Sequence, residues 1–287
     1  MWVVFALLSA FFASVTSILA KCGIKNTPSN LATAIRTIVV LLFAWVMALI
    51  VGSYKTIGQV DAKSWIFLVL SGIATGASWL CYFKALQLGD VNKVVPIDKS
   101  STVLTLLLSF IIFQEAVTAF KWVGVALIAV GTFLMITKKA VKDDGEKKSK
   151  AWIVYALLSA VFASAQAILS KLGIDGVESN LGTAIRTCVV LVMAWIMVFA
   201  TKEHTAIKKI DKKELIFILL SGLATGASWL CYYKAMRDGV LSAVVAIDKL
   251  SILITIAFSF IVFKEKLSLK AGIGLTLVVG GTVCMLF

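Results

Sequence analysis

The chain has 287 residues, of which 60% are hydrophobic, and its mean hydropathy is +0.99. No ordinary soluble domain has that balance, so the composition excludes a water-soluble globular protein and indicates a membrane protein. The net charge of +13 does not indicate a nucleic-acid partner, because the lysines are spread over short segments between apolar runs, where they are typical of membrane topology signals.

Ten apolar runs follow one another along the chain, each of about 20 residues, which is the length that an α-helix needs to cross a bilayer. In the first half they are roughly 2–20, 31–51, 64–86, 94–113 and 119–137, and in the second half roughly 152–170, 181–200, 215–236, 244–263 and 269–287. The first run has no basic start and recurs in the second half, so we interpret it as a mature helix rather than a cleavable signal peptide. The sequence therefore predicts an all-α integral membrane protein with ten transmembrane helices.

The second half of the chain repeats the first at an offset of 150 residues. Residues 71–82 read SGIATGASWLCY, residues 221–232 read SGLATGASWLCY, and roughly half of all positions match without a gap. Between the copies lies a charged segment without apolar content, which is typical of a solvated linker. We expect one five-helix repeat at 1–137, a charged cytoplasmic linker at 138–151 and a second repeat at 152–287.

An odd number of helices per repeat requires the second copy to be inverted relative to the first. The side that holds the linker carries 18 lysines and arginines, the opposite side carries 6, and four lie inside the apolar runs. Because positive charge accumulates on the cytoplasmic side, this distribution predicts a cytoplasmic linker and both termini outside, in a bacterial inner or plasma membrane.

Hydroxyl side chains recur at helical spacing on the third and fourth predicted helices of each half. Such stripes are typical either of interhelical hydrogen bonds or of the wall of a wetted cavity. The adjacent face of the third helix carries Gly72 and Gly76, a spacing that lets helices approach closely. Its aromatic residues could form a cage for a cation or serve as packing and interfacial anchors. The first helices add Ser9, Thr16, Ser159 and Gln166.

Charged residues lie inside several of the predicted spans, where they are costly and usually face a cavity or a partner. Arg36 could form an ion pair with Asp98 that only holds the bundle together, and Lys84 and Lys99 could extend to the membrane surface. Alternatively, the cluster and its copy in the second half bind substrate, with one cluster on each side of a midplane cavity. The expected substrate-binding residues are Arg36, Ser71, Thr75, Ser78, Trp79, Tyr82, Lys84, Asp98, Lys99, Ser101, Thr105, Arg186, Ser221, Thr225, Ser228, Trp229, Tyr232, Lys234, Asp248, Lys249, Ser251 and Thr255.

Signatures of catalysis and of cofactor binding are missing from the sequence. The single histidine, His204, lies in a charged loop, and the five cysteines are scattered without metal-ligand or disulfide spacing. There is also no nucleotide-binding P-loop, so any transport would run on gradients or exchange. We expect no catalytic residue, no metal and no cofactor.

The two five-helix halves, the short basic linker and the repeated AIRT, SG-x-ATGASWLCY and IDK segments resemble the EamA family of the drug/metabolite transporter superfamily. The resemblance covers the whole chain, once per half, so that the chain looks like a tandem fusion of two short five-helix EamA proteins. It implies ten helices in two inverted repeats, a central cavity, alternating access, and export or exchange of small metabolites. Many family members have both termini in the cytoplasm, whereas the lysine distribution here predicts the reverse.

The sequence thus favours a secondary active transporter of a small polar, anionic metabolite. Two other functions remain open: a flippase for an anionic lipid carrier, and an ion channel. The expected partners are membrane lipids and a small-molecule substrate, with no nucleic acid. The chain is expected to work as an internal pseudo-dimer, and weak homodimerisation is left open.

Overall fold

The computed structural model describes residues 1–23, 26–88, 91–135, 151–263 and 268–287, and within these ranges the regular elements are helices, with no strand. The first half contains α1 (Trp2–Gly23), α2 (Ser29–Val51), the 3₁₀ turn η1 (Ser53–Gln59), α3 (Ala62–Leu88), α4 (Val91–Lys99), α5 (Ser101–Ile112) and α6 (Ala119–Met135). The second half contains α7 (Ala151–Ile174), α8 (Ser179–Ala200), the 3₁₀ turn η2 (Glu203–Lys209), α9 (Lys212–Asp238), α10 (Leu241–Asp248), α11 (Ser251–Phe263) and α12 (Leu269–Cys284).

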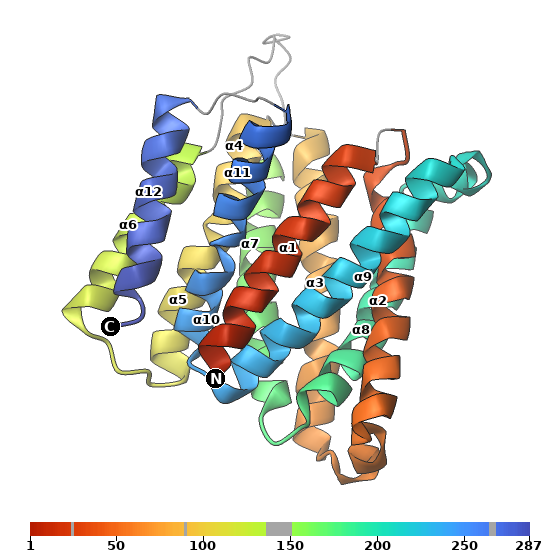
Figure 1. The fold of residues 1–287 in the computed structure, drawn as a ribbon, viewed down its shortest axis with the longest axis horizontal. Coiled ribbons are helices and arrows are strands. Elements are labelled where there is room, and N and C mark those ends of the chain that lie inside the picture. Colours follow the sequence, from red (N-terminus) through yellow and green to blue (C-terminus); the bar gives the residue numbers. More distant parts are fainter. Residues whose placement is uncertain (24–25, 89–90, 136–150, 264–267) are drawn as a thin grey trace.

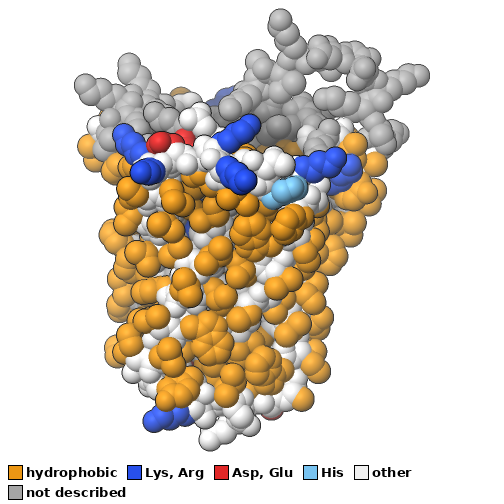
Figure 2. Space-filling view, turned by 90° about the vertical axis from the view of Figure 1, so that its right-hand side faces the viewer, with side chains coloured by type: hydrophobic (Ala, Val, Ile, Leu, Met, Phe, Trp, Pro, Cys, Tyr) orange, Lys and Arg blue, Asp and Glu red, His pale blue; other side chains and the backbone are white. Residues whose placement is uncertain are grey.

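The helices match the expected apolar runs and confirm an all-α membrane protein. Eight segments of the described chain are long and apolar enough to cross a bilayer, and α6 and α12 are shorter apolar helices of 17 and 16 residues. Figure 2 shows hydrophobic side chains covering the visible face between the two ends of the molecule, with most of the lysine and histidine side chains gathered at one end. This belt is the surface that a lipid bilayer would cover.

The fourth apolar run of each half differs from its prediction, because it forms two helices instead of one. In the second half, α10 and α11 are joined by tight i→i−3 bonds: Lys249 N donates to Ala246 O (3.1 Å) and Leu250 N to Ile247 O (2.9 Å). In the first half, α4 and α5 meet at Ser100 in the same way. Pro96 precedes that turn, but its counterpart in the second half is Ala246, so a proline is not required for the break.

The two halves interlock rather than lying side by side. Helix α3 packs against α7 and α8, while α9 makes the equivalent contacts with α1 and α2. Gly72 of α3 lies where a Cβ atom would be 2.7 Å from Val189 Cβ of α8, and Gly222 of α9 lies equally close to Val39 Cβ of α2. The close approach expected from the glycine spacing is thus confirmed, and it occurs between the halves.

Helices α6 and α12 form a separate crossing at one side of the molecule (Figure 1). Glycines permit the contact: a Cβ atom on Gly131 would be 2.6 Å from the Gly274 carbonyl oxygen, and one on Gly124 would be 2.8 Å from the Gly281 carbonyl oxygen. Because the reciprocal contacts are the same, the crossing is itself two-fold symmetric.

Both chain termini lie at one end of the molecule, and the ends of α6 and α7 that border residues 136–150 lie at the other (Figure 1). Helix α1 therefore begins where its counterpart α7 finishes, as inversion requires.

The helix caps differ between the two halves. Glu178 caps its own helix α8 through Asn180 N (2.9 Å), whereas the start of α2 is capped by Glu203 of η2 through Leu31 N (3.1 Å). At α3, Asp61 accepts a hydrogen bond from Ser64 N (3.0 Å), and the hydrogen bonds with Ser64 hold the pKa of Asp61 below its ordinary value.

Candidate functional site

A cavity of about 360 Å³ lies between the two halves. Helices of both halves contribute to its wall, as does the turn between α10 and α11. The lining residues are Ser9, Ala13, Thr75, Ser78, Trp79, Ser101, Thr102, Thr105, Ala163, Gln166, Ala167, Arg186, Ser228, Trp229, Tyr232, Tyr233, Val245, Asp248 and Lys249. Hydroxyl groups, aromatic rings and three charged side chains converge there, which is the composition of a site for a small polar ligand.

Arg186 is the central charged residue of this cavity. It lies in the second turn of α8 and is 5% exposed, and its Nη2 donates to Thr75 Oγ1 of α3 (2.7 Å) and to Gln166 Oε1 of α7 (2.8 Å). The guanidinium carbon also lies over the rings of Trp229 (5.2 Å) and Tyr233 (5.5 Å). The buried Nε has no hydrogen-bond partner among the described residues. The guanidinium is thus held through Nη2, while the Nε–H donor is unpaired.

Asp248 and Lys249 reach the cavity wall from the tight turn between α10 and α11. Asp248 Oδ1 accepts a hydrogen bond from Ser9 Oγ of α1 (3.4 Å), and no ion pair is described for Lys249. Since the lining contains two cationic side chains and one carboxylate, the cavity is electropositive.

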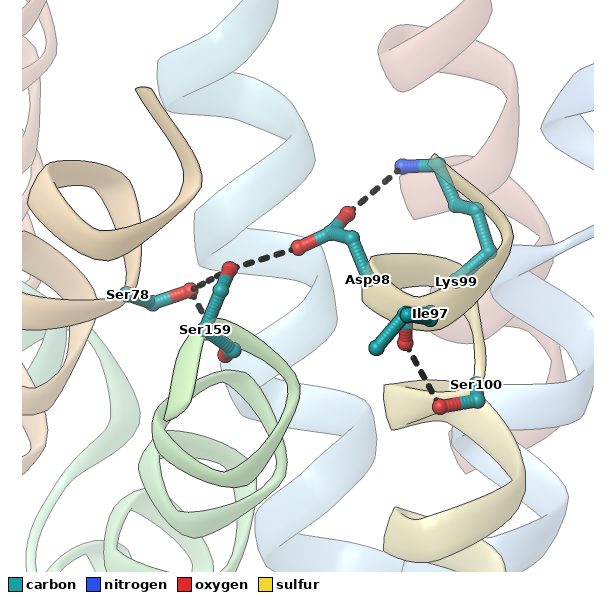
Figure 3. Close-up of polar contacts among 6 residues, drawn as sticks. All are labelled: Ser78, Ile97, Asp98, Lys99, Ser100 and Ser159. Atoms are coloured by element: carbon teal, nitrogen blue, oxygen red, sulfur yellow. Dashed lines mark hydrogen bonds and ion pairs between the residues drawn. The ribbon is translucent and has the colours of Figure 1, made fainter. Parts of the chain in front are cut away.

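The equivalent carboxylate of the first half, Asp98, lies outside the cavity in a network of its own (Figure 3). Ser159 Oγ of α7 donates to Asp98 Oδ1 (2.7 Å), Ser78 Oγ donates to the Ser159 carbonyl oxygen (3.1 Å), and Lys99 Nζ lies 3.6 Å from Asp98 Oδ2. In the described structure, Arg36 therefore forms no ion pair with Asp98. Its hydrogen bond is with Thr33 Oγ1 of its own helix (3.2 Å).

Half of the residues expected in the site line the cavity. They are Thr75, Ser78, Trp79, Ser101, Thr105, Arg186, Ser228, Trp229, Tyr232, Asp248 and Lys249. The remainder lie elsewhere: Arg36, Ser71, Tyr82, Lys84, Asp98, Lys99, Ser221, Thr225, Lys234, Ser251 and Thr255. Three of the four expected charged residues of the second half are thus at the cavity, Lys234 being the exception, and none of those of the first half is.

Several of the residues outside the cavity have local partners instead. Ser71, Ser221 and Thr255 donate to carbonyl oxygens of their own helices, at 2.7 to 2.9 Å. Lys234 pairs with Asp238 one turn further along α9 (2.9 Å), and the Lys99 side chain is 55% exposed. Each predicted stripe thus contains both residues that line the cavity and residues whose hydroxyl groups bond within their own helix.

Two lining residues, Gln166 and Tyr233, did not belong to the expected site although both contact Arg186. Gln166 lies on the polar stripe of its helix, and it differs from Thr16, its counterpart in the first half. Tyr233 corresponds to Phe83, so its hydroxyl is also specific to the second half, where it forms a hydrogen bond with Ser170 Oγ (2.8 Å). A difference between aligned copies was therefore the signal that could have found them.

The sequence profile of the EamA-like transporter family matches residues 1–137 and again residues 150–287. The chain belongs to the EamA-like transporter family. A relative in Sinorhizobium sp, an uncharacterized transporter in the cobO 3′ region, is 42% identical over 134 residues, which are 47% of this chain and 95% of the relative. That relative corresponds to a single half, in agreement with the resemblance to a tandem fusion.

A protein crystal structure superposes on this fold with a TM-score of 0.78, covering 99% of this chain and 95% of the other. Only 16% of the aligned residues are identical, so this likeness shows a shared fold and nothing finer. The family and the named relative make the chain a multi-pass membrane transporter.

Proposed function

We propose that this transporter is a secondary active carrier of a small polar metabolite with an anionic group, and that it works by alternating access. The observation that carries the proposal is the buried Arg186 in the central cavity, with an unpartnered Nε and with Lys249 on the same wall. A guanidinium that is already oriented and partly desolvated binds a carboxylate or phosphate without further ordering.

The arrangement of the two halves supports alternating access. The two repeats are inverted, and the discontinuous fourth helices place Asp248 and Lys249 beside the cavity, as the broken helices of other transporters do. Arg186, Asp248 and Lys249 of the second half line the cavity, while the equivalent Arg36, Asp98 and Lys99 of the first half lie outside it. We further propose that residues 1–137 and 152–287 act together in a single chain, joined by a cytoplasmic linker at 138–151.

The test begins with the purified chain in nanodiscs and a panel of anionic metabolites and lipid headgroups, each paired with a neutral analogue. Compounds that raise the melting temperature are then used for counterflow in proteoliposomes. Arg186→Gln is expected to weaken binding roughly 10- to 100-fold, the loss that corresponds to one hydrogen bond with a charged group. Arg237→Gln is the matched control, because Arg237 is outside the cavity lining.

The outcomes separate the alternatives. Saturable counterflow that falls in Arg186→Gln and not in Arg237→Gln supports the carrier. Passive conductance in planar bilayers without counterflow would instead identify a channel, and stabilisation by lipid headgroups alone would identify a flippase. Full binding of every anion by Arg186→Gln would contradict the proposal.

A further inference from the structure

The equivalent arginines of the two halves lie in different surroundings. Arg186 lines the cavity, whereas Arg36, at the same position in the first half, does not. Arg186 contacts a polar residue of the first helix of its own half and a threonine of the third helix of the other half, and both positions have polar counterparts at the offset of 150 residues. The two contacts of Arg186 are Gln166 and Thr75, and their counterparts are Thr16 and Thr225. The threonine is the same in both sets, so the two sets differ only at the first-helix position, glutamine in one half and threonine in the other.

Gln166 has the reach and the chemistry to hold a guanidinium. Its amide oxygen, at the end of the longer side chain, accepts from Arg186 Nη2 (2.8 Å). Thr75 donates its own hydroxyl proton to the Ser71 carbonyl oxygen (2.9 Å), and this leaves its oxygen free to accept from the same Nη2 (2.7 Å). Two acceptors from two helices thus fix one nitrogen of the guanidinium.

Thr16 does neither. Its hydroxyl donates to the Phe12 carbonyl oxygen of its own helix (3.0 Å) and lies 3.2 Å from Thr225 Oγ1. Thr225 donates to the Ser221 carbonyl oxygen (2.7 Å), and the short side chain of Thr16 bonds back along α1, so neither threonine is hydrogen-bonded to Arg36 in the described structure. Arg36 is left with Thr33 on its own helix (3.2 Å).

We infer that Gln166 is a positioning residue that selects Arg186, and not Arg36, as the anion-binding arginine of the cavity. The inference rests on the proposed function in one respect. It assigns the anionic group of the proposed substrate to the second half of the chain. Gln166 acts through Arg186: it supplies the acceptor that keeps the guanidinium against Trp229 and Tyr233 with its Nε unpaired.

The experiment measures the chemical reactivity of each arginine side chain separately, and it needs no known substrate. The chain contains three arginines, Arg36, Arg186 and Arg237, so the rate of their modification by phenylglyoxal can be followed site by site by mass spectrometry. The full-length protein in nanodiscs is compared with Gln166→Met, Gln166→Glu and Thr16→Gln. Arg237 serves as the internal reference for reagent and for folding.

We expect Arg186 to react more slowly than Arg36 in the original chain. Gln166→Met, which keeps the length and removes the acceptor, should raise the Arg186 rate roughly tenfold, the factor that a lost charge-assisted hydrogen bond corresponds to. Gln166→Glu keeps an acceptor and should restore the slow rate. Thr16→Gln should slow Arg36, because it supplies the missing acceptor in the first half.

An Arg186 rate that does not change in Gln166→Met would overturn the inference. So would an acceleration shared by Arg36 and Arg237, since it would show that the substitution loosens the whole bundle. A second arm adds benzoate or inorganic phosphate as carboxylate and phosphate probes, and either should protect Arg186 and leave Arg36 unprotected. If the Gln166 variants behave as expected but neither anion protects, the positioning role holds and the anionic substrate is contradicted.

Discussion

Lys171 shows how a single side chain can join two helices in an apolar bundle. It lies in the last turn of α7, and its Nζ donates to the carbonyl oxygens of Met236, Arg237 (3.4 Å) and Gly239 (2.9 Å) at the end of α9. The last carbonyl groups of a helix have no partner within the helix, and in a membrane protein water does not always supply one. Lys171 therefore caps α9 and fixes the end of α7 against it.

Replacing Lys171 should destabilise the protein without touching the cavity. We expect Lys171→Met to lower the free energy of unfolding by about 1–3 kcal/mol, because it leaves buried carbonyl groups without donors. Lys270→Met is the control, since Lys270 is exposed at the start of α12. Thermal unfolding in detergent compares the two variants, and equal melting temperatures would show that the carbonyl groups find other partners.

The role of Lys171 could not be read from the sequence, although its recurrence at Lys21 was visible. A lysine near the end of an apolar run fits the topology pattern equally well, and the backbone carbonyl groups that accept its hydrogen bonds leave no trace in the side-chain pattern. The same limit applies to Arg186. Its burial in a span predicted a functional or paired charge, but Gln166 and Tyr233 became its neighbours only through the packing of α7 and α9 around α8.

At the scale of helices, the contacts that hold the bundle together depend on glycine. The sequence predicted close approach for α3, because a G-x-x-x-G pair was present in each copy. It did not predict the crossing of α6 and α12, where the opposing glycines are seven residues apart on each helix. It also missed the tight turns that divide the fourth runs, because the Ile-Asp-Lys segment that the two turns share contains no glycine, and the proline of one copy is alanine in the other.

The contribution of glycine to stability can be tested at the crossing of α6 and α12. Gly131→Ala places a Cβ atom 2.6 Å from the Gly274 carbonyl oxygen. Shifting a backbone atom to relieve this clash costs more free energy than rotating a side chain. We expect a loss of about 1–3 kcal/mol in unfolding free energy, as overpacking costs in other cores. Gly280→Ala, on α12, meets nothing within 4 Å and should leave the melting temperature unchanged or raise it. Similar losses in both variants would assign the effect to something other than the crossing.

At the scale of the whole molecule, the inverted arrangement follows from an odd number of crossings per half. The described termini lie together at one end, and the lysines of η2 and of the start of α9 lie at the other (Figure 1, Figure 2). Sequence reasoning was strongest here, because lipid imposes run length and charge asymmetry directly on the sequence. Which end faces the cytoplasm is a prediction that the fold alone does not test.

Cysteine labelling in intact cells tests that orientation. In a chain whose five cysteines have been replaced, one new cysteine is placed at Gly145 and, separately, one is added after Phe287. The excess of lysine on the linker side predicts that an impermeant maleimide reaches the C-terminal cysteine and does not reach position 145 until the cells are opened. Labelling of position 145 with protection of the C-terminus would invert the topology and make the family's usual arrangement the correct one.

The mismatch between Gln166 and Thr16 has a consequence for how a ligand lies in the cavity. In a pair of identical short chains, every wall residue occurs twice, so a ligand without two-fold symmetry is bound equally well in either of two opposite orientations. Fusion allowed the two copies to diverge, and the wall now has Gln166 and a hydrogen-bonded Arg186 from the second half, whereas the equivalent Thr16 and Arg36 of the first half lie outside it. The cavity therefore distinguishes the head of a ligand from its tail, and a polar molecule should cross in one orientation in every cycle.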